Sequence, residues 1–405
     1  MQIYLVGGAV RDQLLKLPVT DRDYVVVGAT PEQMQTQGYK EVGKDFPVFL
    51  HPKTGEEYAL ARTERKSGKG YKGFSVDFSA DITLEQDLIR RDLTINAMAQ
   101  AEDGSIIDPY NGQKDIKDKF LRHVSPAFAE DPLRVLRVAR FAAKLAHLDF
   151  VIADETLILM QKLCEQGELQ HLTAERVWAE TEKALNTQSP QVYFETLRLC
   201  GALKILMPEL DKLWGIPNPG KWHPEIDTGV HTMMVLEQAC KATEDTQVRF
   251  AAVMHDLGKG KTPEKDWPQH RGHQEAGIPV IKQLCRRLKV PKNYEQLACQ
   301  VSKYHLHCHK MFELRPKTIL KVLKGLSAFR NPNLLEQFIA TCQADFNGRL
   351  GNEHLEYEQG KLLWQCYQTT KDIDTQALME KGFEGQKLGE EIDRVRVQLI
   401  KQLKD

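Results

Sequence analysis

The sequence has 405 residues, 41% of them hydrophobic, and a formal net charge of −1, so we expect two or more domains and exclude a globally basic protein. The eight cysteines form no C-x-x-C pair, which argues against a zinc ribbon or a disulfide framework and indicates a reducing compartment. With no signal-peptide pattern at the start and no apolar run of about 18 residues, we expect a cytoplasmic protein without a membrane partner.

Short apolar runs and helical segments alternate over the first part of the chain, which predicts an α/β fold with a mixed sheet. Thr30 is placed to cap the second of the predicted helices. The expected strands are Ile3–Val6, Tyr24–Val27, Phe46–Leu50 and Glu57–Ala61, and the expected helices are Val10–Leu17 and Pro31–Gln37.

The next segments change in character. Residues 62–73, RTERKSGKGYKG, are basic and rich in glycine, and we expect a mobile loop that either meets RNA phosphates or is a solvated loop without a role. After about residue 130 the strand pattern disappears, and residues 130–146 and 173–185 carry helical spacing. The Pro- and Gly-rich stretch at 215–224 is expected to be a linker before a second helical block.

Two stretches near the start, LVGGAVRD and DRDYVVV, suggest a phosphate and metal site. Asp21 and Asp23 would share one face of a strand, and two adjacent carboxylates favour a cation such as Mg²⁺, which commonly shares its sphere with substrate phosphates. Gly8 allows close approach of the backbone, and Arg11 adds a charge for a phosphate. A lone D-x-D is more often a solvated turn, so the glycine pair upstream carries this interpretation.

This combination resembles the nucleotidyltransferase superfamily. RRDLTINAMA at 90–99 and EDPLRVLRVARF at 130–141 narrow the resemblance to class II tRNA nucleotidyltransferases and the related bacterial poly(A) polymerases. The resemblance implies that Asp21 and Asp23 hold Mg²⁺ and that Gly8 and Arg11 meet a nucleoside triphosphate. It also implies that Arg91 and Asp92 contact the nucleotide and that Asn96 supports them. Glu57 is the candidate for a third catalytic carboxylate, although Ala59 stands at the expected strand position.

Four charged residues recur every three positions and predict a stripe along one helix face. A carboxylate accepts from the amino group of cytosine or adenine while a guanidinium donates to the neighbouring ring nitrogen, and guanine and uracil mismatch both contacts. The resemblance assigns this reading of CTP and ATP to Asp131 and Arg134, and leaves Arg137 and Arg140 for phosphates or for the helix itself. A solvated charged face is the alternative.

A second motif set lies downstream. His231, His255-Asp256 and Asp345 follow the order of the HD metal-dependent phosphohydrolases, a helical fold. Imidazole and carboxylate together bind a divalent transition metal that activates water. His270 and His273 are further candidates; His305 is a weaker one, and His307 and His309 are expected at the surface. For HD domains fused to a tRNA nucleotidyltransferase, the resemblance implies 2′,3′-cyclic phosphodiesterase, 2′-nucleotidase and phosphatase activities, the last with Ni²⁺.

Together these motifs predict an α/β nucleotidyltransferase head (1–140), a helical RNA-binding neck and body (141–222), an all-α HD domain (223–350) and a helical tail (351–405). The expected function is the addition and repair of the tRNA 3′-terminal CCA from CTP and ATP, in a monomer or homodimer. The alternatives are a poly(A) polymerase and an inactive tRNA-binding protein. Recognition of tRNA rests on the family resemblance alone.

Overall fold

The computed structural model describes residues 1–42, 48–66, 74–77, 79–221 and 223–404. Its contacts divide the chain into two compact units, Met1–Leu206 and Met207–Asp405. The finer division into four segments stays a prediction. Among the described residues, no helix has the length and apolar character needed to cross a membrane.

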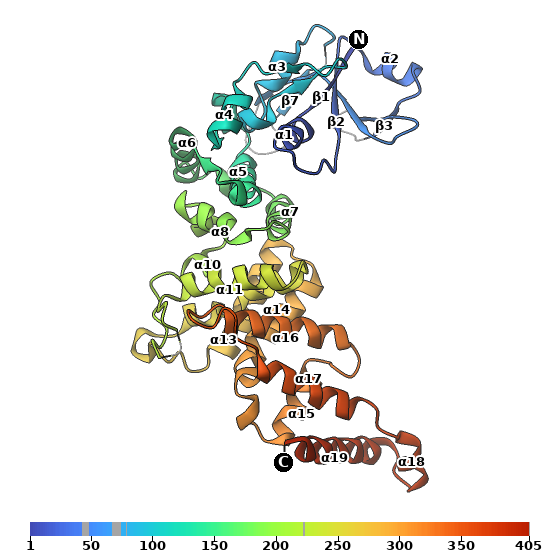
Figure 1. Cartoon of the computed structure of the whole chain (residues 1–405), viewed down its shortest axis with the longest axis vertical. Coiled ribbons are helices and arrows are strands. Elements are labelled where there is room, and N and C mark those ends of the chain that lie inside the picture. Colours follow the sequence, from blue (N-terminus) through green and yellow to red (C-terminus); the bar gives the residue numbers. More distant parts are fainter. Residues whose placement is uncertain (43–47, 67–73, 78, 222, 405) are drawn as a thin grey trace. The chain divides into compact units, whose positions relative to one another are not determined.

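The first unit starts with a mixed sheet in the order β3-β4-β5-β2-β1-β8-β9, drawn in blue shades in Figure 1. The four predicted strands are confirmed as β1, β2, β4 and β5, with ends that differ by one residue in β1, β2 and β5. The predicted start of the third strand, Phe46 and Pro47, lies outside the described residues. The strands of the sheet are β1 Gln2–Val6, β2 Asp23–Val27, β3 Lys40–Val42, β4 Val48–Leu50, β5 Glu57–Leu60, β8 Ala99–Gln100 and β9 Ile106–Ile107.

Strands β2 and β5 are parallel, and their register pairs Asp23 with Glu57. Alternate residues of β2 enter two different cores: Val25 packs with Ala97 and Ala99, whereas Val26 packs with Phe49 and the other residues on the far face. Because side chains alternate along a strand, Asp23 lies on the Val25 face. Glu57 lies on the same face of the neighbouring strand, since directly paired residues point the same way.

Short helices cover this sheet. The cap predicted at Thr30 is confirmed, because its hydroxyl accepts from the Gln33 amide at 3.4 Å and the Gln33 side chain accepts from the Thr30 amide at 3.0 Å. The first helix begins two residues earlier than predicted, at Gly8. The helices of this part are α1 Gly8–Leu14, α2 Pro31–Thr36, α3 Leu84–Leu88 and α4 Gly112–Asp118.

The prediction of a loop at 62–73 is wrong for its first part. Residues Thr63–Lys66 form strand β6, which pairs antiparallel with β7 (Phe74–Asp77). Residues 67–73, which include Lys69 and Lys72, lie outside the described part of the chain. The hairpin pairing of β6 with β7 depends on residues on both sides of the basic run, so the run alone did not indicate it.

The rest of the first unit is helical apart from two short strands, β10 (Phe120–Leu121) and β11 (Val151–Ile152), which pair in parallel. The segments with helical spacing are confirmed as α5 and α7. Helix α5 packs against both α7 and α8, in the green part of Figure 1. The helices are α5 Leu133–Leu145, α6 Asp154–Glu165, α7 Ala174–Leu185, α8 Pro190–Leu199 and α9 Ala202–Leu206.

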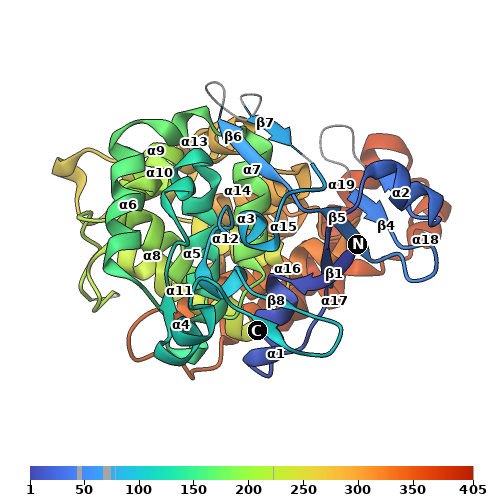
Figure 2. The same ribbon diagram turned by 90° about the horizontal axis from the view of Figure 1, so that it is seen from above.

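The second unit consists of helices joined by loops, with no strand among its described residues. Helix α11 contacts α12 and α16, and α14 contacts α12, α13 and α16; these helices can be followed in Figures 1 and 2. The helices are α10 Pro208–Asp211, α11 Thr228–Ala242, α12 Thr246–Met254, α13 His273–Leu288, α14 Lys292–His309, α15 Pro316–Gly325, α16 Pro332–Asn347, α17 Glu358–Lys371, α18 Thr375–Glu380 and α19 Gly385–Lys404.

The expected linker at 215–224 is instead part of an ordered loop of the second unit. We call residues 215–221 and 223–227 the pre-α11 loop. The Asn218 amide donates to the Ile226 carbonyl at 2.5 Å, and the Thr228 amide donates to the Ile216 carbonyl at 2.9 Å. The Pro and Gly residues therefore shape a turn that folds back on itself, a role that composition does not distinguish from a linker.

Candidate functional site

A cavity of about 760 Å³ opens in the first unit, within residues 6–183. Its walls come from the sheet, from the segment after α3 and from α5 and α7. It brings together every site residue that the sequence predicted for this half of the chain. These residues are Gly8, Arg11, Asp21, Asp23, Glu57, Arg91, Asp92, Asn96, Asp131, Arg134, Arg137 and Arg140.

The turn after β1 needs glycine for two reasons. Gly7 has a φ of +70°, which other L residues adopt only with strain, and a Cβ on it would lie 2.8 Å from the guanidinium of Arg91. The bare backbone thus lets Arg91 approach the turn at the cavity. Arg91 is anchored from behind by Asp87, whose carboxylate oxygen lies 3.3 Å from a terminal guanidinium nitrogen.

Three carboxylates line the sheet side of the cavity: Asp21, Asp23 and Glu57. The prediction that Asp21 and Asp23 share one strand is wrong, because β2 begins at Asp23 and Asp21 lies just before it. The ladder with β1 ends at the pair Val6–Asp23, so residues before Asp23 have no partner in β1. Burial, together with the nearby Asp21 carboxylate, raises the pKa of Asp23. A raised carboxyl pKa marks a place where a cation would be favourable.

A chain of hydrogen bonds ties three elements together behind these carboxylates. The Arg11 guanidinium donates to the Asn96 side chain at 2.5 Å, and the Asn96 amide donates to Asp92 at 3.0 Å. Arg137 of α5 completes the chain by donating to Asp92 at 2.7 Å. Burial alone would raise the pKa of Asp92, but Arg137 and Asn96 outweigh it and hold that pKa well below its usual range. Asp92 therefore stays ionised and fixes Arg137.

The buried ring of Phe141 holds three guanidinium groups at the cavity. Those of Arg140, Arg11 and Arg137 lie 4.4, 4.9 and 5.8 Å from its centroid. Cation–π contacts of this kind are favourable where water is limited, and they hold mutually repelling cations in one place. The group provides concentrated positive charge, as a polyphosphate requires.

The expected stripe on one helix is only partly confirmed. Arg134, Arg137 and Arg140 lie on α5, but Asp131 precedes it with φ −118° and ψ 102°. The cause is Pro132, because a residue before proline is pushed out of the helical region. The Asp131 carboxylate accepts from the Leu133 amide at 3.1 Å and lies 2.8 Å from the Arg176 guanidinium.

Arg134, the predicted partner of Asp131 in base reading, also has structural contacts. Its guanidinium donates to the backbone carbonyls of Ala127 at 2.7 Å and Arg90 at 2.5 Å. These bonds fix the plane of the group at the cavity wall. It lies beside Asp131 in the same cavity, as the prediction requires.

The sequence analysis missed three basic residues of this cavity, Lys144, Arg176 and Lys183. Arg176 and Lys183 are seven residues apart on α7, so they share a face of that helix, and Glu180 on the same helix binds Arg140 at 2.6 Å. The spacing of these charges within 173–185 was the available signal. Only the packing of α7 on α5 shows which face meets the cavity.

The second unit brings together the residues predicted from the HD pattern. The ligand atoms of His231, His255 and Asp345 lie within 4.8 Å of one another, and so do those of Asp256, His273 and His305. The two groups adjoin, because His255 Nε2 is 3.1 Å from Asp256 and 4.0 Å from Asp345. All six side chains are buried.

Backbone carbonyls set the orientation of three of these imidazoles. The Nδ1 atoms of His255, His273 and His305 lie 2.7 Å from the Ala252 carbonyl, 2.8 Å from the His270 carbonyl and 3.0 Å from the Val301 carbonyl. Each Nδ1 therefore carries a proton, which leaves Nε2 as the ring nitrogen on the side of the cluster, near Asp256 in all three histidines. Such outer hydrogen bonds are typical of histidines that bind metals.

The packing that gathers these groups depends on Gly258, directly after the His-Asp pair. A Cβ there would overlap the backbone carbonyl of His273, so glycine allows the turn Leu257–Lys261 to touch the start of α13. This contact brings Asp256 to 3.3 Å from His273 Nε2. Gly258 is thus required for close packing at this turn.

Two atoms of the cluster fit a metal ion. His255 Nε2 and Asp256 Oδ1 are buried and have no hydrogen-bond partner within the described residues. Burial opposes the charged form of His255, but the carboxylates of Asp256 and Asp345 outweigh it and raise its pKa. Burial lowers the pKa of His305 to about 3, so that imidazole is neutral across the physiological range.

Two predictions about the other histidines need correction. His309 is not at the surface: its Nε2 lies 2.6 Å from Asp345, and its Nδ1 lies 2.8 Å from the Tyr357 hydroxyl. His270 does not join the ligand groups, because its Nε2 lies 2.8 Å from the Pro217 carbonyl and its Nδ1 lies 2.6 Å from the Thr262 hydroxyl. His270 instead orients His273 through its own backbone carbonyl. His307 is half-buried.

Three family models match the chain. The poly A polymerase head domain matches residues 3–122, and the HD domain matches residues 228–328. Between them, the model described as the probable RNA and SrmB-binding site of polymerase A matches residues 149–213. The chain carries a poly A polymerase head domain and an HD domain. This confirms the predicted domain content.

The fold of the chain is similar to the fold of solved CCA-adding enzymes. An apo CCA-adding enzyme has 21% sequence identity and a TM-score of 0.69, over 98% of this chain and 88% of that one. A CCA-adding enzyme in complex with CTP has 21% identity and a TM-score of 0.67, over 98% and 87%. The Thermotoga maritima CCA-adding enzyme complexed with tRNA has 20% identity and a TM-score of 0.65, over 99% and 90%.

The raised pKa of His255 leads to a prediction about metal binding in the HD domain. Because this imidazole holds its proton at higher pH than an ordinary histidine, a metal ion must displace that proton. We expect binding of a divalent metal ion near neutral pH to release a proton and to weaken as the pH falls. Calorimetry in two buffers of different ionisation enthalpy measures the release, and equal heats in both buffers would contradict it.

Proposed function

We propose that the protein adds the 3′-terminal CCA to tRNA from CTP and ATP. The observation that carries the proposal is the cavity of the first unit. It sets three carboxylates on the sheet side against a group of guanidiniums and the Asp131–Arg134 pair. Carboxylates for Mg²⁺, guanidiniums for a triphosphate and a carboxylate–guanidinium pair for a base are the parts that a nucleotide-adding site needs.

Nucleotidyl transfer would proceed by attack of the tRNA 3′-hydroxyl on the α-phosphate, with pyrophosphate leaving. The carboxylates fit Mg²⁺, since Asp23 is next to Glu57 in the register and near Asp21. When bound, Mg²⁺ supplies charge neutralisation and activates the attacking hydroxyl. Asp21 and Asp23 would hold it. Arg11 and Arg137, fixed through Asn96 and Asp92, would hold the triphosphate in line for attack.

Base choice would use Asp131 and Arg134. The carboxylate accepts from the amino group of cytosine or adenine, and the guanidinium donates to the ring nitrogen beside it. Guanine and uracil leave both groups unpaired, at about 1–3 kcal/mol for each group in a closed site. The hydrogen bonds of Arg134 to backbone carbonyls and the contact of Asp131 with Arg176 support this role, because they fix the orientation of both side chains.

Replacing Asp131 by alanine is expected to relax discrimination against UTP and GTP, by about 5- to 150-fold in the ratio of kcat/KM values. The measurement is single-nucleotide incorporation on tRNA that lacks CCA, with each of the four NTPs in turn. Arg134→Lys keeps the positive charge but loses the planar set of guanidinium donors, so it should also relax the discrimination among nucleotides. Arg330→Ala, which removes an exposed arginine of the second unit, is the matched control. An equal rate loss with all four nucleotides would mean that Asp131 only positions the nucleotide.

A poly(A) polymerase is the second candidate, because the matching head-domain model carries that description. The two activities share their chemistry and differ in product. Incubation with ATP alone distinguishes them on tRNA that lacks CCA. A poly(A) polymerase extends long A tails from ATP alone. The proposed enzyme adds A efficiently only after two C residues are present.

We further propose that the HD domain is a metal-dependent phosphohydrolase. The support is the buried cluster of His231, His255, Asp256 and Asp345, with His273 and His305 beside it. A divalent transition metal, for which Ni²⁺ is our candidate, would lower the pKa of bound water and supply the nucleophile. The imidazoles of the cluster would hold such an ion, and the carboxylates would balance its charge.

The substrates we propose for the HD domain are 2′,3′-cyclic phosphates, 2′-phosphates and other phosphoesters. A cyclic phosphate at a damaged tRNA end blocks the 3′-hydroxyl that must attack CTP. Its hydrolysis would provide ends that the first unit can extend. Hydrolysis of these compounds with and without added Ni²⁺ tests the proposal, and activity that is independent of metal would contradict it.

A further inference from the structure

His231 differs from the other imidazoles of the HD-domain cluster in what orients it. Three of them use backbone carbonyls within their own turns. His231 lies in the first turn of α11, where the Thr228 carbonyl three residues earlier accepts from the Thr232 hydroxyl at 2.8 Å. The Nδ1 atom of His231 lies instead 2.9 Å from Glu225 Oε1.

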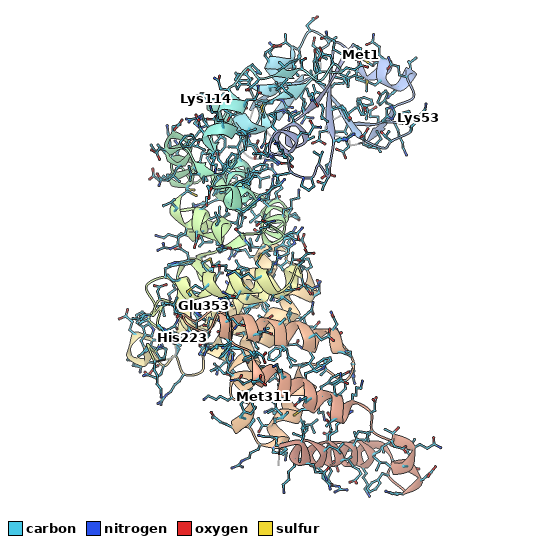
Figure 3. All side chains as sticks on the ribbon, in the orientation of Figure 1. Met1, Lys53, Lys114, His223, Met311 and Glu353 are labelled. Atoms are coloured by element: carbon cyan, nitrogen blue, oxygen red, sulfur yellow. The ribbon has the colours of Figure 1, made fainter. Side chains whose placement is uncertain are left out.

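Glu225 belongs to the pre-α11 loop, and its side chain is only 2% exposed. His223, which Figure 3 labels, lies on the same loop with its Nδ1 2.9 Å from the same carboxylate oxygen. Both imidazoles thus lie against one carboxylate oxygen, and His223 is hydrogen-bonded to it. On the other side of the His231 ring, Nε2 is 3.2 Å from Asp345, at the centre of the ligand group.

The loop is itself fixed on the cluster. Lys259, which lies 2.6 Å from Asp256, also donates to Asn218 of the loop at 2.8 Å. His270 Nε2 lies 2.8 Å from the Pro217 carbonyl, and Asp227 accepts from the Gly215 amide at 2.6 Å. These contacts hold the loop against the cluster, and they therefore fix the position of Glu225.

We propose that Glu225 is a positioning residue of the HD-domain metal site, acting through His231. Its carboxylate oxygen, 2.9 Å from Nδ1, favours the proton on that nitrogen and so leaves the Nε2 lone pair for a bound ion. The carboxylate also increases the basicity of the imidazole, which strengthens its bond to a metal. This inference rests on the proposed metal site and adds a residue from outside the His…His-Asp…Asp pattern.

The test is the affinity of the purified full-length protein for Ni²⁺ alone, measured by calorimetry. Glu225→Ala is expected to weaken binding by about 10- to 100-fold, the range for loss of such an outer partner. Glu225→Gln keeps an acceptor without the charge and should give an intermediate loss. Glu264→Ala, which removes an exposed carboxylate of the same unit, is the matched control and should bind as wild type. Circular dichroism confirms that each variant is folded.

A double-mutant cycle shows whether Glu225 acts through His231. In a His231→Ala background, Glu225→Ala should cause no further loss of affinity, because the ring that it orients is gone. Additive losses would overturn the inference. So would wild-type affinity in Glu225→Ala, or a drop in the number of bound ions with the remaining affinity intact, which would make Glu225 itself a ligand.

The same experiment separates this inference from the function on which it rests. If the His255→Ala, Asp256→Ala double variant binds Ni²⁺ as tightly as the wild type, the proposed metal site is contradicted. If the double variant loses Ni²⁺ binding but Glu225→Ala retains it, only the role of Glu225 is contradicted.

Discussion

Replacing Asp23 by alanine is expected to abolish nucleotide addition, with a loss on the order of 1000-fold or more, because a metal ion contributes several kcal/mol to such transfers. Asp23 lines the cavity together with Asp21 and is paired in register with Glu57. The raised pKa of its carboxyl indicates charge that a cation would relieve. The measurement is single-turnover incorporation of CTP into tRNA that lacks CCA, for Asp23→Ala and separately for Asp21→Ala.

The control for this prediction is Asp154→Ala, which removes an exposed carboxylate at the start of α6, outside the cavity. It should add CTP as wild type does. Glu57→Ala tests the third carboxylate, and a large loss would assign it the role that the register supports. Full addition by either Asp21→Ala or Asp23→Ala in folded protein would refute the metal assignment.

The second large effect concerns the HD domain. His255→Ala combined with Asp256→Ala is expected to reduce metal-dependent hydrolysis of a 2′,3′-cyclic phosphate to the background rate. Both residues are buried in the cluster, and each has an atom without a partner that a metal would satisfy. CCA addition should be retained, because the cavity of the first unit contains no residue beyond Lys183.

His354→Ala, an exposed histidine of the second unit, is the control for this variant. It should hydrolyse the cyclic phosphate as wild type does and respond equally to a chelator. Hydrolysis that persists in the double variant would exclude the cluster as the site. Loss of both hydrolysis and addition would mean that the two activities are not independent.

Much of the cavity of the first unit could be predicted from short sequence motifs. Asp21, Asp23, Arg91 and Asp92 belong to short patterns, and the structure brings them to one cavity. Patterns could not reveal Arg176, because its place depends on the face that α7 turns toward α5. Asp131 lies off the expected helix because Pro132 follows it, a local rule that was available in the sequence.

The second site shows the same limit. His231, His255, Asp256 and Asp345 were found from their order, whereas His309 was taken for a surface residue. Its role depends on tertiary packing, because it lies between Asp345 on α16 and Tyr357 just before α17. Composition likewise indicated a linker at 215–224, whereas the pre-α11 loop is ordered and places Glu225 2.9 Å from His231.

The proposal that this protein selects C and then A without a nucleic-acid template can be tested most directly by sequencing its products. Transfer RNA that lacks CCA is incubated with the protein and all four NTPs at equal concentration, and the new 3′ ends are sequenced. The account predicts that the added residues are C, C and A in that order and that extension then stops. Tails of A alone, or mixed tails that include U or G, would contradict it.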